Sequence, residues 1–168
     1  MQSILELKNR LDNLYNRVVN NNEDVLVAMD ELLVEIIKYE NLDGYNDEEV
    51  EMIVSLISSF TEKANIIYDL LDIKRDNLLT IENLRNEFRM IEMKRFNIVN
   101  NYVMGIVKIS DVNSFKDNLF NFRNKLYAIP INDDNLLEIA KMKSKIQHYN
   151  TEVLEDEELL RLAYSNSN

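Results

Sequence analysis

The chain has 168 residues, of which 46% are hydrophobic and 29% are charged. This balance is typical of a chain that buries a core, and it excludes a disordered polar segment. Cysteine is absent, so both a disulfide framework and a thiolate zinc site are excluded. The formal net charge of −11 disfavours direct nucleic-acid binding, because phosphate backbones are also negative, and it favours a partner with a basic surface.

Glycine and proline are scarce, with two glycines and one proline in the whole chain. Helices tolerate this scarcity better than sheets, whose hairpins depend on special turn residues. We therefore predict an all-α fold, an elongated helical bundle with coiled-coil-like packing around one long central helix. A single domain, 1–168, is expected to contain all of the predicted helices, which span about 2–20, 23–41, 47–103, 112–128, 133–149 and 154–164.

The first two predicted helices form a hairpin. In each, apolar residues recur at spacings of three and four, which is typical of an amphipathic helix. These residues are Ile4, Leu7, Leu11, Leu14 and Val18 in the first helix and Val25, Met29, Leu32, Leu33 and Ile36 in the second. Asn22 is predicted to cap the second helix, because its side chain accepts a hydrogen bond from backbone N–H groups that lack a helical partner.

The third predicted helix determines the architecture. Asn46 and Glu49 have the spacing of a capping box at its start. No glycine or proline follows between Asp47 and Val103, and the apolar spacing continues with one slip near Ile81. A continuous helix over 47–103 would be about 85 Å long at a rise of about 1.5 Å per residue. The alternative is a break within the polar stretch 72–77.

The same polar stretch resembles, over barely a dozen residues, the loop of a calcium-binding EF-hand. Asp72 and Asp76 stand at two positions of this loop that would hold calcium ligands. Lys74 replaces a further ligand and Asn83 replaces the bidentate glutamate. We therefore expect calcium binding to be badly impaired.

Two helices and a short acidic segment complete the prediction. The helix 112–128 has one apolar face, which consists of Phe115, Leu119, Phe122 and Leu126. Pro130 should end it, since proline disfavours helix in the residue before it. The helix 133–149 and the short acidic helix 154–164 then follow.

The sequence lacks the usual constellations of catalytic residues. His148 is the only histidine, and Lys145 stands where a di-iron bundle would need a glutamate. Acidic pairs such as Glu31 with Glu35 fit solvated helix faces. We expect no enzymatic activity, no cofactor and no metal site, and a small all-α hydrolase that uses carboxylates and Mg²⁺ is the least favoured alternative.

Two apolar stripes lie outside the expected core. Ile66, Leu70 and Ile73 project away from the apolar face of the long helix, and Phe120 and Tyr127 lie about 120° from the apolar face of 112–128. Either another helix of the same chain covers each stripe, or the stripe is an interface. The second alternative predicts a homo-oligomer.

The C-terminal helix combines an acidic run with leucines. Its candidate interface residues are Glu155, Asp156, Glu157, Glu158, Leu159 and Leu160. Such a segment either caps the bundle or docks into a basic groove of a partner.

The sequence favours a non-catalytic protein–protein interaction module, in the sense of an adaptor, an assembly chaperone or an inhibitor, that presents an acidic helical surface. The main alternative is an acidic mimic of nucleic acid that inhibits a DNA- or RNA-binding protein. The longest apolar run, Val25–Met29, is far shorter than the roughly 20 residues that span a bilayer. Residues 1–8 carry charge where a signal peptide would be apolar, so we expect a cytoplasmic protein that is not bound to a membrane.

Overall fold

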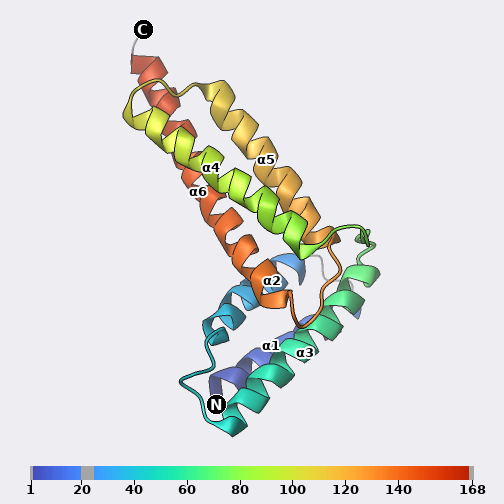
Figure 1. Cartoon of the computed structure of the whole chain (residues 1–168). Coiled ribbons are helices and arrows are strands. Elements are labelled where there is room, and N and C mark those ends of the chain that lie inside the picture. The colour runs from blue at the N-terminus through green and yellow to red at the C-terminus, as the bar shows by residue number, and fades with distance from the viewer. Residues whose placement is uncertain (1, 20–24, 167–168) are drawn as a thin grey trace. The chain divides into compact units, whose positions relative to one another are not determined.

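The computed structural model describes residues 2–19 and 25–166, and the side chains of residues 3–18 and 25–163. Within these ranges the regular structure is helical and no strand is present, which confirms the all-α prediction (Figure 1). The elements are α1 (Gln2–Val19), α2 (Val25–Ile36), the 3₁₀ helix η1 (Ile37–Tyr39), α3 (Asp47–Leu70), α4 (Ile81–Val103), α5 (Ile109–Ala128) and α6 (Leu136–Asn166). The predicted cap Asn22 lies outside the described residues.

The chain divides into two compact units. The first unit comprises Met1–Asn77 and Ala128–Lys141, and the second comprises Leu78–Tyr127 and Met142–Asn168. The single domain predicted over 1–168 stays a prediction, because two compact units can still unfold in one cooperative transition.

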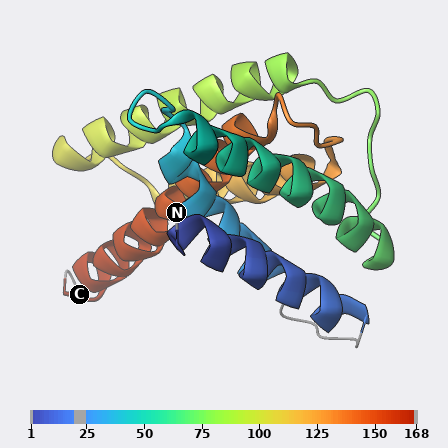
Figure 2. The ribbon, with the colours of Figure 1, turned by 90° about the horizontal axis from the view of Figure 1, so that it is seen from below.

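The first unit is built around α1, which packs against both α2 and α3. Figures 1 and 2 show α1 alongside α3. All ten apolar residues that define the predicted faces of the first two helices are buried. The core residues contributed by α3 include Ile53, Leu56, Phe60, Ala64 and Ile67. The apolar spacing thus correctly identifies the core side of these helices.

The continuous helix predicted over 47–103 is wrong. α3 begins with the predicted capping box, in which Asn46 and Glu49 exchange hydrogen bonds, but it ends at Leu70. α4 begins at Ile81, directly after a new N-cap, Thr80. The break therefore covers and slightly exceeds the polar stretch that we considered as the alternative.

The end of α3 has a specific hydrogen-bond pattern, a Schellman motif. The backbone N–H of Ile73 donates to the carbonyl oxygen of Tyr68 at 2.9 Å, and the N–H of Asp72 donates to that of Asp69 at 3.1 Å. Asp72 has a left-handed φ of 58°. Aspartate adopts this conformation more readily than most residues other than glycine. The motif therefore ends the helix although no glycine is present.

Contacts within the first unit anchor the connection between α3 and α4. The guanidinium of Arg75 lies over the ring of Tyr68, 4.4 Å from its centroid. It also donates to the backbone oxygen of Ile129 and to the side-chain oxygen of Asn65, at 3.0 Å in each case. The connection is therefore fixed both to α3 and to the segment that follows α5.

We expect the Arg75→Ala substitution to lower the free energy of unfolding by about 1–3 kcal/mol, since it leaves two partly buried acceptors without their donor. Lys74→Ala is the matched control, because the neighbouring Lys74 is exposed. Urea denaturation followed by circular dichroism measures both changes. Equal effects of the two substitutions would show that the Arg75 contacts contribute nothing specific.

The second unit is a three-helix bundle of α4, α5 and residues 142–166 of α6 (Figure 1). Its core contains Leu84, Phe88, Ile91, Ile98, Val112, Phe115, Leu119, Phe122, Leu126, Ile146 and Val153. α4 ends in a second Schellman motif, in which Gly105 has a φ of 73° and the N–H of Ile106 donates to the carbonyl oxygen of Asn101. α5 then begins at Ile109, slightly earlier than predicted.

The separate helices predicted at 133–149 and 154–164 are also wrong, because α6 is one helix over both. The buried residues Ile146, Val153 and Leu160 follow each other at intervals of seven, so the core face passes through the predicted gap without interruption. The segment between these ranges contains no glycine or proline. The elongated arrangement and the coiled-coil-like packing stay predictions.

Candidate functional site

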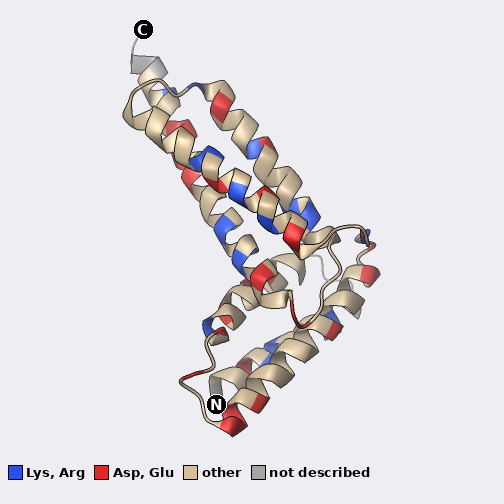
Figure 3. Cartoon of the chain, in the orientation of Figure 1, with Lys and Arg blue, Asp and Glu red and all other residues tan. Residues whose placement is uncertain are grey.

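The acidic charge is distributed unevenly between the two units. The first unit contains 8 of the 19 Lys and Arg residues and 20 of the 30 Asp and Glu residues, for a net charge of −12. The second contains the other 11 basic and 10 acidic residues, for a net charge of +1. Figure 3 shows acidic residues at the start of α3, where Asp47, Glu48 and Glu49 form the first turn. The whole excess of negative charge thus belongs to the first unit.

α4 in the second unit carries apolar residues on its solvent side as well as on its core side. Met90, Met93, Phe96 and Val99 are all exposed, and Phe96 exposes 65% of its surface. The exposed apolar residues continue past the end of the helix. We call the whole set the α4 surface, which consists of Met90, Met93, Phe96, Val99, Val103, Met104 and Ile106.

Sequence reasoning missed the α4 surface because its first four residues are each three positions apart. At 3.6 residues per turn, a constant spacing of three winds about 60° backwards around the helix at each step. The row therefore crosses the outer side of α4 obliquely. The alternating spacing of three and four that marks a buried face does not detect such a row, although a search for repeated spacings of three would.

The predicted stripe on the long helix lies in the first unit. Ile66 and Leu70 are exposed there, by 38% and 54%. Ile73 is half-buried, and its backbone N–H closes the Schellman motif at the end of α3. The three residues therefore do not continue along one helix as predicted.

The predicted pair on α5 is also divided. Phe120 exposes 61% of its surface. Tyr127 is half-buried, and the Lys143 ammonium nitrogen lies 4.2 Å from its ring centroid. A residue of the same chain thus covers Tyr127, and only Phe120 of the pair is exposed.

Half of the C-terminal acidic run contacts its own bundle. Asp156 accepts from Arg95 at 2.6 Å, and Glu157 accepts from Lys116 at 3.0 Å. The Lys116 ammonium holds the pKa of Glu157 below its usual range. Leu160 is buried, whereas Glu155, Glu158 and Leu159 are exposed. The segment therefore caps the bundle on one side and leaves a smaller acidic face than the sequence suggested.

Arg95 occupies a core position of α4 and bridges two carboxylates on α6. Its Nε donates to Glu152 at 2.9 Å, its Nη1 donates to Asp156, and the side chain is only 10% exposed. Charge-assisted hydrogen bonds of this kind are roughly twice as strong as neutral ones. Arg95 therefore joins α4 to α6 and is a structural residue.

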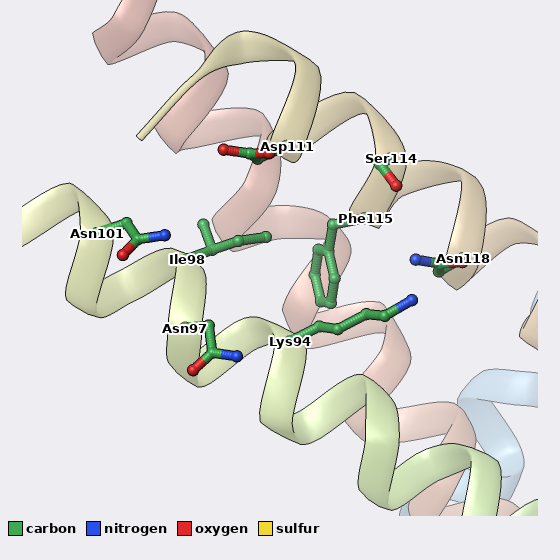
Figure 4. A pocket seen from close by; sticks show the side chains of 8 residues that line it. All are labelled: Lys94, Asn97, Ile98, Asn101, Asp111, Ser114, Phe115 and Asn118. Carbon is green, nitrogen blue, oxygen red and sulfur yellow. The ribbon is translucent and has the colours of Figure 1, made fainter. Parts of the chain in front are cut away.

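An open surface pocket of about 220 Å³, called the cavity below, lies between α4 and α5. Its lining residues Lys94, Asn97, Asp111 and Ser114 are exposed to solvent. Six polar side chains line it, namely those of Lys94, Asn97, Asn101, Asp111, Ser114 and Asn118. The apolar side chains of Ile98 and Phe115 form the part of the wall between the two helices (Figure 4). The cavity thus combines one cation, one carboxylate, three amides and a hydroxyl with an apolar floor.

The residues that we considered for catalysis or metal binding lie apart. His148 is exposed and contacts Glu152 at 2.8 Å. Glu35 accepts from Arg10, which lowers the pKa of this carboxyl group. Among the side chains described, no group of three His, Asp or Glu residues is placed to hold a metal ion.

No helix in the described part of the chain is both long and apolar enough to cross a membrane. No protein-family model matches the sequence, and no curated protein or solved structure is significantly similar to it. Function must therefore be inferred from the chain's own residues.

Proposed function

We propose that the chain is a non-catalytic protein-binding module. Its second unit pairs two copies of the chain through the α4 surface, and its first unit offers an acidic surface to a basic protein partner. The observation that carries this proposal is the exposed row Met90, Met93, Phe96 and Val99 on a helix whose other side is already buried in the bundle core.

The composition of the α4 surface favours a protein interface. Isolated exposed apolar residues are common, but a continuous apolar patch on a soluble domain usually marks an interaction site. Phenylalanine and methionine are enriched in interface cores, and the flexible methionine side chain adapts to the shape of a partner. Removing such surface from water contributes roughly 25 cal/mol per Å², so pairing supplies a driving force that is largely independent of salt.

The charge distribution indicates which unit pairs. Two first units, each with a net charge of −12, repel one another, whereas two second units, each at +1, meet no such barrier. This supports pairing through the α4 surface rather than through Ile66 and Leu70, which belong to the acidic unit. The concentrated negative charge also favours a second candidate for the first unit, the acidic mimic of nucleic acid.

The Phe96→Asp substitution tests the pairing. Light scattering behind gel filtration should give the wild type twice the 19.9 kDa of one chain and give the variant a single-chain mass at the same micromolar concentration. A buried charge without a partner opposes association strongly, whereas the exposed Phe96 contributes little to the monomer fold. The wild-type result should persist from about 0.1 to about 1 M salt, since apolar contacts are not screened.

Phe120→Asp is the matched control, because Phe120 is about as exposed as Phe96 and lies on another helix of the same unit. It should leave the dimer intact. A wild type with the mass of one chain at all concentrations would end the proposal of self-association, and a dimer that Phe120→Asp alone disrupts would move the interface to α5.

A further inference from the structure

We propose that the cavity between α4 and α5 binds a small aliphatic zwitterion, a molecule with a carboxylate at one end and an ammonium group at the other. This inference is independent of self-association. It rests on the two opposite charges in the cavity wall, on the polar side chains between them and on the apolar floor.

The two charges lie at different ends of the cavity. Figure 4 shows the Lys94 side chain extending toward Asn118, away from Asp111. Asp111 is held in place near the start of α5, where one of its oxygens accepts the backbone N–H of Lys108 at 3.4 Å. The Lys94 end therefore suits an anionic group, and the Asp111 end suits a cationic group.

Lys94 lacks the carboxylate partner that several basic residues of the second unit have. Arg95, Lys116 and Lys125 each form an ion pair with a carboxylate of the same unit. Within the described part of the chain, Lys94 forms no such pair. The Lys94 ammonium thus remains available to a ligand that enters the cavity.

The remaining polar side chains also have unused hydrogen-bonding capacity. The side chains of Asn97, Asn101, Ser114 and Asn118 form no hydrogen bond with any other described residue. Each amide provides two donors and one acceptor. These groups can therefore bind either end of the ligand: the amide N–H groups suit its carboxylate, and the amide oxygens suit its ammonium.

The floor and the volume define the middle of the ligand. Ile98 and Phe115 are buried, with 7% and 1% of their surface exposed, and they form an apolar wall between the charged ends. A volume of about 220 Å³ has room for about seven waters at roughly 30 Å³ each, which matches a short aliphatic chain with two charged ends. Lys94 and Asp111 are both exposed, so a ligand with only one charge would pair with only one of the two groups and would lack the second electrostatic contact.

Titration of the ¹⁵N-labelled full chain tests the inference. The probes are 3-aminopropanoate, 4-aminobutyrate and 6-aminohexanoate, which vary the separation of the charges, together with the singly charged butylamine and butanoate. At least one zwitterion should shift the amide resonances of residues 94–101 and 111–118 with saturation. The singly charged compounds should bind about two- to fivefold more weakly, because Lys94 and Asp111 are exposed and solvent weakens each charged contact.

Two variants and one control complete the experiment. Lys94→Met and Asp111→Asn should each weaken the zwitterion about two- to fivefold, whereas Arg89→Met, which removes an exposed cation of α4 outside the cavity wall, should not change its affinity. Unchanged circular dichroism shows that the variants are folded. The inference is overturned if none of the zwitterions shifts these resonances, if butylamine or butanoate binds equally well, or if Lys94→Met binds like the wild type.

Discussion

Replacing Arg95 by alanine should lower the free energy of unfolding by about 3 kcal/mol. Removing one partner of a buried ion pair typically costs about 3–5 kcal/mol, because the remaining charge stays desolvated. Here the substitution leaves the carboxylates of Glu152 and Asp156 without their cation, and it opens a space in the core of the second unit. The lower end of the range applies because the Glu152 and Asp156 side chains keep 33% and 19% of their surface exposed. Urea denaturation monitored by circular dichroism measures the change.

Two further variants identify the cause. Arg89→Ala removes an exposed arginine from the same helix and should change the stability by less than about 0.5 kcal/mol. Combining Arg95→Met with Glu152→Gln and Asp156→Asn removes all three charges together and should recover most of the loss. If the triple variant is as unstable as Arg95→Ala, the loss comes from packing rather than from the unpaired carboxylates.

Arg95 also illustrates how far the sequence determines the core. The apolar face of the segment 84–102 runs through Leu84, Phe88 and Ile91 to Ile98, and Arg95 occupies the position between the last two. An arginine there is compatible with burial only if carboxylates face it, and those come from α6, more than 50 residues further along the chain. Helical spacing could identify the position, but it could not identify the partners.

The break between α3 and α4 has a similar explanation. Local signals in 47–103 favour one helix, since the stretch has no glycine or proline and its apolar spacing continues with only one slip, near Ile81. The helix ends at Leu70 because Asp72 takes the left-handed position and because Arg75 binds a distant part of the first unit, the oxygen of Ile129. Of these two causes, only the left-handed conformation of Asp72 has a signal in the local sequence. That signal is weak, because aspartate adopts this conformation much less often than glycine does.

The candidate sites were accessible from the sequence to different degrees. The α4 surface could have been found, because its four helical residues are regularly spaced in the sequence. The cavity could not, because Lys94 and Asn97 face Asp111 and Asn118 only once the pairing of α4 with α5 is known. The acidic run 155–158 was conspicuous, yet half of it contacts Arg95 and Lys116, since charge in a sequence carries no information about which side of a helix finds a partner.

A core substitution in the first unit should show whether the two units unfold independently. Phe60 is fully buried in that unit, and Phe60→Ala should lower the free energy of unfolding by about 3–5 kcal/mol through lost contacts and an unfilled cavity. Because each unit has its own core, amides in α1–α3 should lose hydrogen-exchange protection well before those in α4 and α5.

Phe115→Ala is the reciprocal variant, since Phe115 is equally enclosed in the core of the second unit, with 1% of its surface exposed. It should lower protection in α4 and α5 more than in α1–α3. Hydrogen exchange measured by mass spectrometry on both variants resolves the helices separately. If both substitutions lower protection equally in all helices, the units unfold in one transition, as the sequence-based prediction of a single domain over 1–168 requires.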